Sequence, residues 1–211
     1  MSRVDRTNRS MDTFSDALYG NPVGTSQNNC YAYAINHYVN SGDTKLQPGM
    51  LAGIETSVDL SSCTDLVQRV KADAKAMGWK LTVLSSKDAT CPRGSIKFAS
   101  VIAPNDDFHF YKFHKHVLYK VKTPRSVSEL AREFGVSTSD IHVPGTDGQV
   151  RLGDVVLVRN ANVWSHKQGF SPDGPILKDS CGRVIKDPAV ACRDYVGLNY
   201  KTTCTTFCLQ K

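Results

Sequence analysis

One cysteine of this chain lies where a nucleophilic thiol is expected. Cys30 follows a turn-rich segment, Gly24–Asn29, and begins an apolar run that fits a helix. The first turn of a helix presents unpaired backbone N–H groups, and the helix dipole favours an anion there. A thiolate in that position has a lowered pKa and reacts more readily near neutral pH. Cys30 is therefore the first candidate nucleophile, and the alternative is a buried, inert cysteine on the same helix.

Two histidines in strand-like segments are candidate partners for this thiol. His109 lies in an alternating aromatic and polar run, Asp107–Phe113, and His166 lies in a second short strand, Val163–Lys167. A thiol becomes a good nucleophile when a neighbouring imidazole takes its proton. That imidazole needs a fixed partner on its other nitrogen to hold the right tautomer. Either histidine alone also fits an ordinary packed or turn residue.

The elements that must position these residues follow from hydrophobic periodicity. We expect a helix from Cys30 to about Val39, and a second helix from Ser62 or Thr64 to Met77. Strands are expected at residues 79–84, 95–102, 107–113, 155–158 and 163–167. A short helix around Met11–Leu18 is expected within a flexible lead, residues 1–24. The pattern predicts an α+β fold.

A segment between the two histidines forms a unit of its own, residues 117–159. A strand-like stretch precedes a short helix with a capping box, Ser126 and Glu129, and a stop at Gly135. Another helical turn follows at 136–141, and the chain returns as a strand at 152–158. The order strand, helix, helix, strand predicts a small inserted module.

This unit resembles a LysM module over Tyr119–Val158. The resemblance rests on Leu-Ala-x-x-Phe-Gly-Val-Ser at 130–137 and on Leu-Gly-Asp-x-Val-x-Val at 152–158. It departs from the LysM pattern at 123–127 and 142–145, near the sugar groove. The resemblance implies binding of N-acetylglucosamine-containing polymers such as peptidoglycan, and the alternative is a scaffold insertion without glycan affinity.

Without the insertion, the two histidine strands become neighbours in a hairpin. The motifs that then assemble are 29–34 (Asn-Cys-Tyr-Ala-Tyr-Ala), 47–49 (Gln-Pro-Gly), 107–111, 164–169 and 179–188. Together they resemble papain-like cysteine peptidases and amidases of the NlpC type, in a bacterial and viral group, and the first motif also resembles CHAP amidases. The resemblance implies a papain-like domain over 25–116 and 160–211, in which the cysteine helix packs on an antiparallel sheet that carries the histidines.

The resemblance also implies roles for the site residues. Cys30 is the expected nucleophile, His109 the base and His166 the residue that orients the base. Asp179 competes with His166 for the orienting role, and the reverse assignment of the two histidines is also open. The oxyanion would be stabilised by the backbone N–H of Cys30, with help from the side chain of Gln27 or Asn29. Water then hydrolyses the acyl-enzyme, and no metal or cofactor is implied.

Composition sets limits on class and location. The chain has 211 residues, 40% of them hydrophobic and 22% charged, as in an ordinary soluble globule. No apolar run approaches the length that spans a bilayer, and Met1–Asp16 lacks the apolar core of a signal peptide. We therefore expect cytoplasmic synthesis, followed by packaging in a virus particle if the protein leaves the cell.

Cysteine number bears on the redox state. Seven cysteines cannot all pair, which suits one reserved thiol. Without a signal peptide, reduced thiols are the expectation. Four cysteines lie near the C-terminus: Cys181, Cys192, Cys204 and Cys208. Disulfides and a four-thiolate zinc site are the alternatives, although no Cys-x-x-Cys pair is present.

The sequence favours a cysteine-dependent amide hydrolase acting on peptidoglycan or protein. One alternative is a structural component of a virus particle, in which a decayed papain-like fold and the LysM-like unit are contact surfaces for protein partners. Nucleic-acid binding is the weaker alternative. It would use a basic and aromatic strip over residues 111–122, which is more typical of a solvated strand face.

Overall fold

The computed structural model describes residues 13–15, 27–38, 45–143, 145, 149–169, 171, 174–195 and 197–211. The helices, including two 3-10 turns, are α2 (Cys30–Ala34), η2 (Met50–Ala52), α3 (Cys63–Ala76), α4 (Val127–Phe134) and η3 (Thr138–Asp140). The strands up to the insertion are β1 (Thr13–Ser15), β2 (Lys80–Leu84), β3 (Ile96–Ala103), β4 (Asp107–His114) and β5 (His116–Lys120). The later strands are β6 (Ile141–His142), β7 (Val155–Val158), β8 (Val163–His166), β9 (Asp194–Tyr195), β10 (Leu198–Asn199) and β11 (Thr202–Gln210). This is the expected α+β class.

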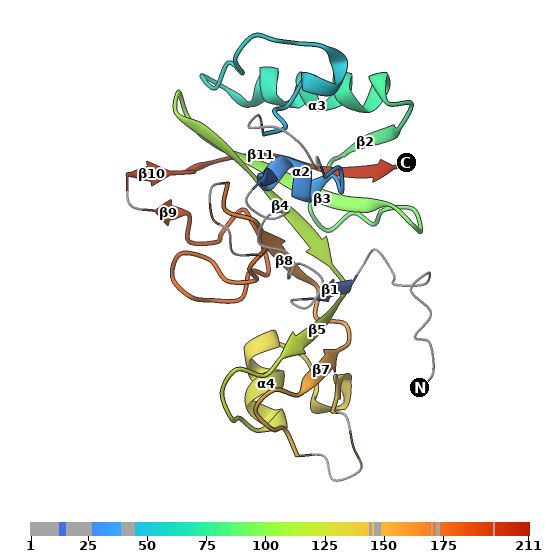
Figure 1. Ribbon diagram of the computed structural model, residues 1–211, viewed down its shortest axis with the longest axis vertical. Helices are drawn as coiled ribbons and strands as arrows, with labels where there is room; N and C mark the ends of the chain where they lie inside the picture. The colour runs from blue at the N-terminus through green and yellow to red at the C-terminus, as the bar shows by residue number, and fades with distance from the viewer. Residues whose placement is uncertain are drawn as a thin grey trace.

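A five-stranded antiparallel sheet carries both candidate histidines. Its order is β2-β11-β3-β4-β8, so the C-terminal strand inserts between two early ones (Figure 1). His166, the last residue of β8, pairs with Tyr111 of β4, and β8 pairs with β4 only over Tyr111–His114. The first half of β4, which includes His109, therefore forms a free edge of the sheet beyond the end of β8.

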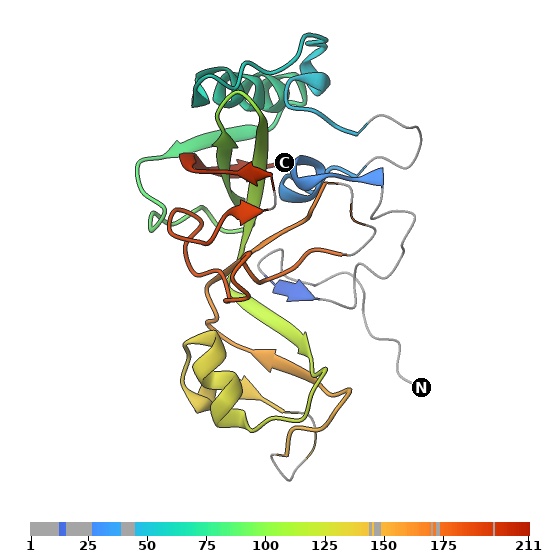
Figure 2. The ribbon, with the colours of Figure 1, turned by 90° about the vertical axis from the view of Figure 1, so that its left-hand side faces the viewer.

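Apolar side chains of α2 and α3 cover one face of this sheet. The Tyr31 ring lies 4.9 Å from Phe110 of β4, and Phe98 stacks at 4.8 Å on Phe207 of β11. Leu66 of α3 joins the same buried cluster. Figure 2 shows α2 on one side of the sheet and the β9–β10 segment on the other. The alternation of β4 therefore directs Phe110 toward the helices and His109 toward the opposite face.

A buried carboxylate joins α2, α3 and the turn between them. Asp73 of α3 accepts hydrogen bonds from the Tyr31 hydroxyl at 2.8 Å, the Gly49 N–H at 2.7 Å and the Ala52 N–H at 2.9 Å. Gly49 has a φ of 97°, and a Cβ there would lie 3.1 Å from Ile54 Cβ, so both conformation and space require glycine. These bonds fix the Gln-Pro-Gly turn beside the start of α2.

Two of the predicted helices are confirmed and one is shorter than expected. α3 begins after Ser62, whose hydroxyl accepts from the Thr64 N–H, and α4 has the predicted capping box of Ser126 and Glu129. α2 ends at Ala34 instead of Val39, because Ile35 leaves the helix and Asn36 adopts a φ of 52°. A left-handed residue cannot continue a right-handed helix.

A second, four-stranded sheet of order β1-β5-β7-β6 lies below the main sheet in Figures 1 and 2. Three of its strands follow β4 in the chain, and β1 comes from the N-terminal part. α4 packs on this sheet through Leu130 and Phe134, in a buried cluster with Val117 and Val156. The predicted second helix is a single 3-10 turn, η3. The sheet therefore differs in detail from the expected strand-helix-helix-strand unit.

The N-terminal prediction is wrong where the structure describes it. Thr13–Ser15 is a strand, β1, that pairs in parallel with β5, and not part of a helix or a flexible lead. Phe14 packs edge-on against the His114 ring at 5.3 Å, which anchors this strand. The rest of the expected helix Met11–Leu18 and of the lead lies outside the described residues.

The expectation of reduced thiols is wrong for six cysteines. The disulfides are Cys63–Cys204, Cys91–Cys208 and Cys181–Cys192, and Cys30 is free. Two of these bonds join β11 to segments more than 100 residues away, a proximity that local spacing cannot reveal. The four C-terminal cysteines are thus bonded and do not form a thiolate zinc site. None of the helices in the described ranges is long and apolar enough to cross a bilayer.

Candidate active site

A pocket of about 520 Å³ opens at the free edge of β4, beyond the end of β8. It is lined by Asn29, Cys30, Lys45, Gln47, Asp107, Phe108, His109, His166, Gln168, Gly169, Ser171, Tyr195, Leu198 and Tyr200. Cys30, His109 and His166 thus contribute to one cavity although they come from α2, β4 and β8. The cavity brings together side chains from both faces of the sheet because the sheet ends there.

Cys30 is the first residue of α2 and is 4% exposed. Burial raises the pKa of its thiol to about 12, and the charge of Asp107 acts in the same direction. Hydrogen bonds from the backbone N–H groups of Phe110 and Tyr31, and the charge of Lys167, oppose this shift. The predicted lowering of the Cys30 pKa is therefore wrong. A helix of five residues has too small a dipole to offset the loss of hydration.

The two histidines are joined directly. Nε2 of His109 lies 2.8 Å from Nδ1 of His166, and Nε2 of His166 lies 3.0 Å from the carbonyl oxygen of Lys178. A carbonyl oxygen only accepts, so Nε2 of His166 carries a proton and its Nδ1 is the acceptor. Nε2 of His109 must then be the donor. This chain of two bonds assigns the proton of neutral His109 to Nε2 and leaves Nδ1 as its basic nitrogen.

Both imidazoles are neutral near pH 7. Burial lowers the pKa of His109 well below its ordinary value, and the charge of His166 adds to that effect. Burial also lowers the pKa of His166, against the hydrogen bond to Lys178 and the charge of Asp179. At rest, the pocket therefore contains a neutral thiol and two neutral imidazoles, and not a thiolate–imidazolium pair.

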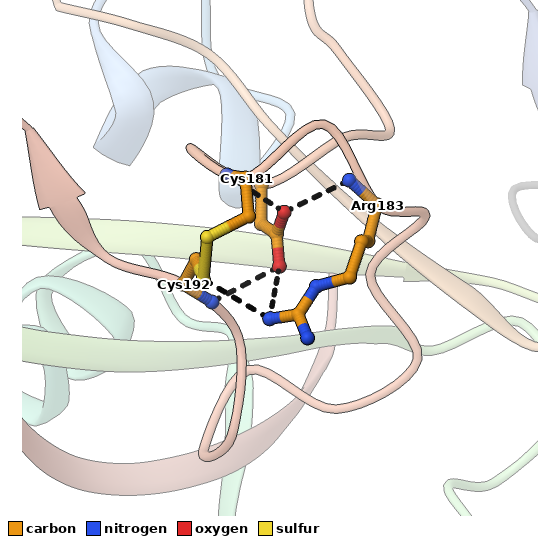
Figure 3. The surroundings of a disulfide bond; sticks show 4 residues. Cys181, Arg183 and Cys192 are labelled. Carbon is orange, nitrogen blue, oxygen red and sulfur yellow. Dashed lines mark hydrogen bonds and ion pairs between the residues drawn. A yellow bond between two sulfur atoms is a disulfide. The ribbon is translucent and has the colours of Figure 1, made fainter.

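Asp179 lies outside the pocket and holds together the loop of Cys181, Arg183 and Cys192, which Figure 3 shows. Its carboxylate accepts from the backbone N–H groups of Cys181 at 3.0 Å, Arg183 at 2.9 Å and Cys192 at 3.0 Å. The Arg183 guanidinium adds an ion pair at 3.3 Å. This loop carries the Lys178 carbonyl that bonds His166, so Asp179 acts on His166 through the backbone as well as through its charge.

Within the part of the chain that the structure describes, one group of three potential metal ligands lies in the Asp179 loop. The carboxylate of Asp179 and the sulfurs of Cys181 and Cys192 lie within 4.8 Å of one another. The two sulfurs are bonded to each other, and the Arg183 guanidinium lies 3.0 Å from the Cys192 sulfur. A disulfide is not a thiolate, so this group does not have the donors of a zinc site.

The two predicted oxyanion residues have different places. Asn29 is the N-cap of α2: its Oδ1 accepts from the Ala32 N–H at 3.1 Å, and its Nδ2 donates to the Leu46 carbonyl at 2.7 Å. Asn29 lines the pocket, but both polar atoms of its side chain already bond backbone groups that fix the start of α2. Gln27 is partly buried and is not among the described residues that line the pocket. Gln47 does line it, and its amide can donate to an oxyanion.

Several residues of the pocket were missed from the sequence. The Tyr200 hydroxyl donates to Asp107 at 2.7 Å, and Lys45 Nζ donates to the Gly169 carbonyl across the pocket wall. Lys167 does not line the pocket; it is almost fully buried and donates to the carbonyls of Gln168 at 2.9 Å and of Ser171 at 3.1 Å, two residues that do line it. Lys167 belongs to the 164–169 motif noted in the sequence. No sequence signal pointed to Tyr200, which lies 93 residues from Asp107.

No protein-family model, curated protein or solved structure matches this chain. A function for the pocket has to be inferred from its own residues.

Proposed function

We propose that this protein is a cysteine-dependent amide hydrolase with Cys30 as nucleophile, His109 as base and His166 as the orienting residue. One observation carries the proposal: His109 and His166, bonded in series to the Lys178 carbonyl, line the same pocket as the free Cys30. It favours His109 as base over the reverse assignment, because His166 has both ring nitrogens engaged. A resemblance to papain-like enzymes supports the same roles.

The reaction follows from the tautomer. As the Cys30 sulfur bonds to the carbonyl carbon of the substrate, its proton moves to Nδ1 of His109. The tetrahedral intermediate collapses with cleavage of the C–N bond, and the amine leaves with that proton. A water molecule then gives a proton to His109 and attacks the thioester, which releases the acid and restores the thiol.

The neutral resting site determines when the proton moves. With the pKa of Cys30 raised to about 12 and that of His109 lowered, proton transfer before attack is unfavourable. Transfer coupled to attack avoids the buried ion pair. The charge of the oxyanion would be stabilised by the backbone N–H of Cys30 and the amide of Gln47.

Peptidoglycan stem peptides and proteins are the proposed substrates. The order β5, α4, η3, β7 follows that of a LysM module, which supports glycan binding by residues 117–159. The added strands β1 and β6 are departures from that pattern. Three disulfides favour a protein that works in an oxidising environment, such as a protein carried in a particle and released outside the cell.

A structural role is the second candidate. The observation that favours it is the burial of Cys30 with a raised thiol pKa, which also describes an inert core cysteine. In that case the fold and the 117–159 unit serve as contact surfaces in a particle.

Release of new amino groups separates the two candidates. Purified peptidoglycan and an unfolded protein are incubated with the wild type, with Cys30→Ser and with Lys71→Ala, an exposed residue of α3. The hydrolase proposal predicts amine release from at least one substrate, lost in Cys30→Ser and retained in Lys71→Ala. Release from neither substrate, or release unaffected by Cys30→Ser, contradicts it.

A further inference from the structure

A second pocket, of about 540 Å³, has no lining residue in common with the first. It lies between the β2–β3 loop, the end of β4 and the start of β8. Phe113 and Trp164, paired across β4 and β8, form part of its wall. Phe113 is four residues beyond His109 along β4, roughly 13 Å away in an extended strand. The two pockets are therefore separate sites.

Positive charge dominates this second pocket. Five cationic side chains and one carboxylate, Asp88, line it; the cations are Lys87, Arg93, Lys97, Lys115 and Lys186. Lys87 pairs with Asp88 at 2.8 Å, which leaves the other four cations without an ion pair to any described residue. A concave surface lined by one sign of charge concentrates the opposite ion.

Backbone carbonyls fix the ammonium groups of two of the cations. The Lys97 ammonium donates to the Ala89 carbonyl at 2.9 Å and lies 5.1 Å from the centre of the Phe113 ring. The Lys186 ammonium donates to the Ala161 carbonyl at 2.5 Å. Burial lowers the pKa of both side chains. An anion in the pocket would offset this loss of hydration.

A buried hydroxyl in the pocket wall provides an independent indication. Ser95 lines the pocket and is 4% exposed, and its Oγ has no hydrogen-bond partner among the described residues. An unpaired buried hydroxyl is unfavourable in the folded protein, since it has lost water without gaining a partner. An acceptor oxygen on a ligand would satisfy it.

We propose that this pocket binds an anion with several phosphate groups. Its volume is in the range of small-ligand sites, and four cations without carboxylate partners suit more than one negative group. Free oligophosphate and the phosphate chain of a nucleotide have this chemistry in common. The proposal is independent of the hydrolase function.

Calorimetric titration with sodium triphosphate tests the proposal. The wild type is expected to bind triphosphate, and the double variant Arg93→Gln with Lys115→Gln to bind it at least tenfold more weakly. Both side chains are exposed, so these changes leave the core intact. The matched control removes two charges from exposed positions of α3, Lys71→Gln with Lys75→Gln, and is expected to bind as the wild type does.

Ser95→Ala separates binding from folding. Removal of an unpaired hydroxyl is expected to leave the thermal midpoint unchanged or higher, while the affinity for triphosphate falls several-fold. Titration with ATP distinguishes the sources: equal affinity indicates an oligophosphate site, and tighter binding of ATP indicates a nucleotide site. Absence of binding below millimolar triphosphate, or equal losses in the pocket and α3 variants, would overturn the proposal.

Discussion

At the scale of single residues, the tautomer of His109 is the central feature of the candidate site. The Lys178 carbonyl fixes the proton on His166, and His166 in turn fixes the proton on His109. Two hydrogen bonds thereby select which nitrogen is basic. Sequence reasoning identified the three residues by type, but it could not order the bonds between them, because that order depends on a backbone carbonyl of Lys178.

The role of His166 can be tested by substitution. His166→Ala removes the acceptor for His109 Nε2–H, so we expect kcat for amide hydrolysis to fall about 100-fold with a smaller change in KM. His166→Asn restores an acceptor oxygen and is expected to recover part of the loss. Steady-state kinetics of the three proteins checks this. Equal losses in both variants would indicate a packing role for His166.

At the scale of elements, the helices could be predicted from local sequence signals, whereas the long-range pairing of strands could not. α3 and α4 were predicted because their caps, Ser62 and Ser126, are encoded within a few residues of each helix. The place of β11 between β2 and β3 was not predictable, since it depends on pairing across about 100 residues. The parallel pairing of β1 with β5 was missed for the same reason.

The loop held by Asp179 is expected to support the site through its backbone. Asp179→Asn keeps the side-chain size but replaces one acceptor oxygen with a donor that faces backbone N–H groups. We expect a loss of about 1–3 kcal/mol in the free energy of unfolding, measured by urea denaturation. The pH profile of alkylation at Cys30 should keep its shape. A changed profile with unchanged stability would assign Asp179 a direct role in the site.

At the scale of the whole molecule, buried histidines make the fold sensitive to acid. Burial lowers the pKa of His109 and of His114 well below the ordinary value near 6.5. Below that pH the unfolded chain binds protons that the folded chain does not, so stability is present above about pH 6.5 and is lost as the pH falls. The expected loss is about 1.4 kcal/mol per pH unit for each histidine. Equal urea midpoints at pH 7.5 and pH 5.5 would contradict this.

Disulfide bonding also affects the whole molecule, because β11 is linked to both α3 and the β2–β3 loop. The protein denatured without reductant should show one reactive thiol per chain, and seven after reduction. With Cys91–Cys208 intact, the Cys63–Cys204 bond closes an effective loop of roughly 30 residues, so we expect a loss of roughly 4 kcal/mol when that bond is removed. Seven thiols before reduction would show that the cysteines are not paired.

The most direct measurement for the hydrolase proposal is the rate of iodoacetamide alkylation of Cys30 between pH 6 and 9, in the wild type and in His109→Ala. If His109 takes the thiol proton during attack, the wild-type rate should be nearly constant over this range. In His109→Ala only the thiolate reacts, so the rate should rise about tenfold per pH unit toward the Cys30 pKa of about 12. The same steep rise in both proteins, or no labelling of native Cys30, would contradict the catalytic pair.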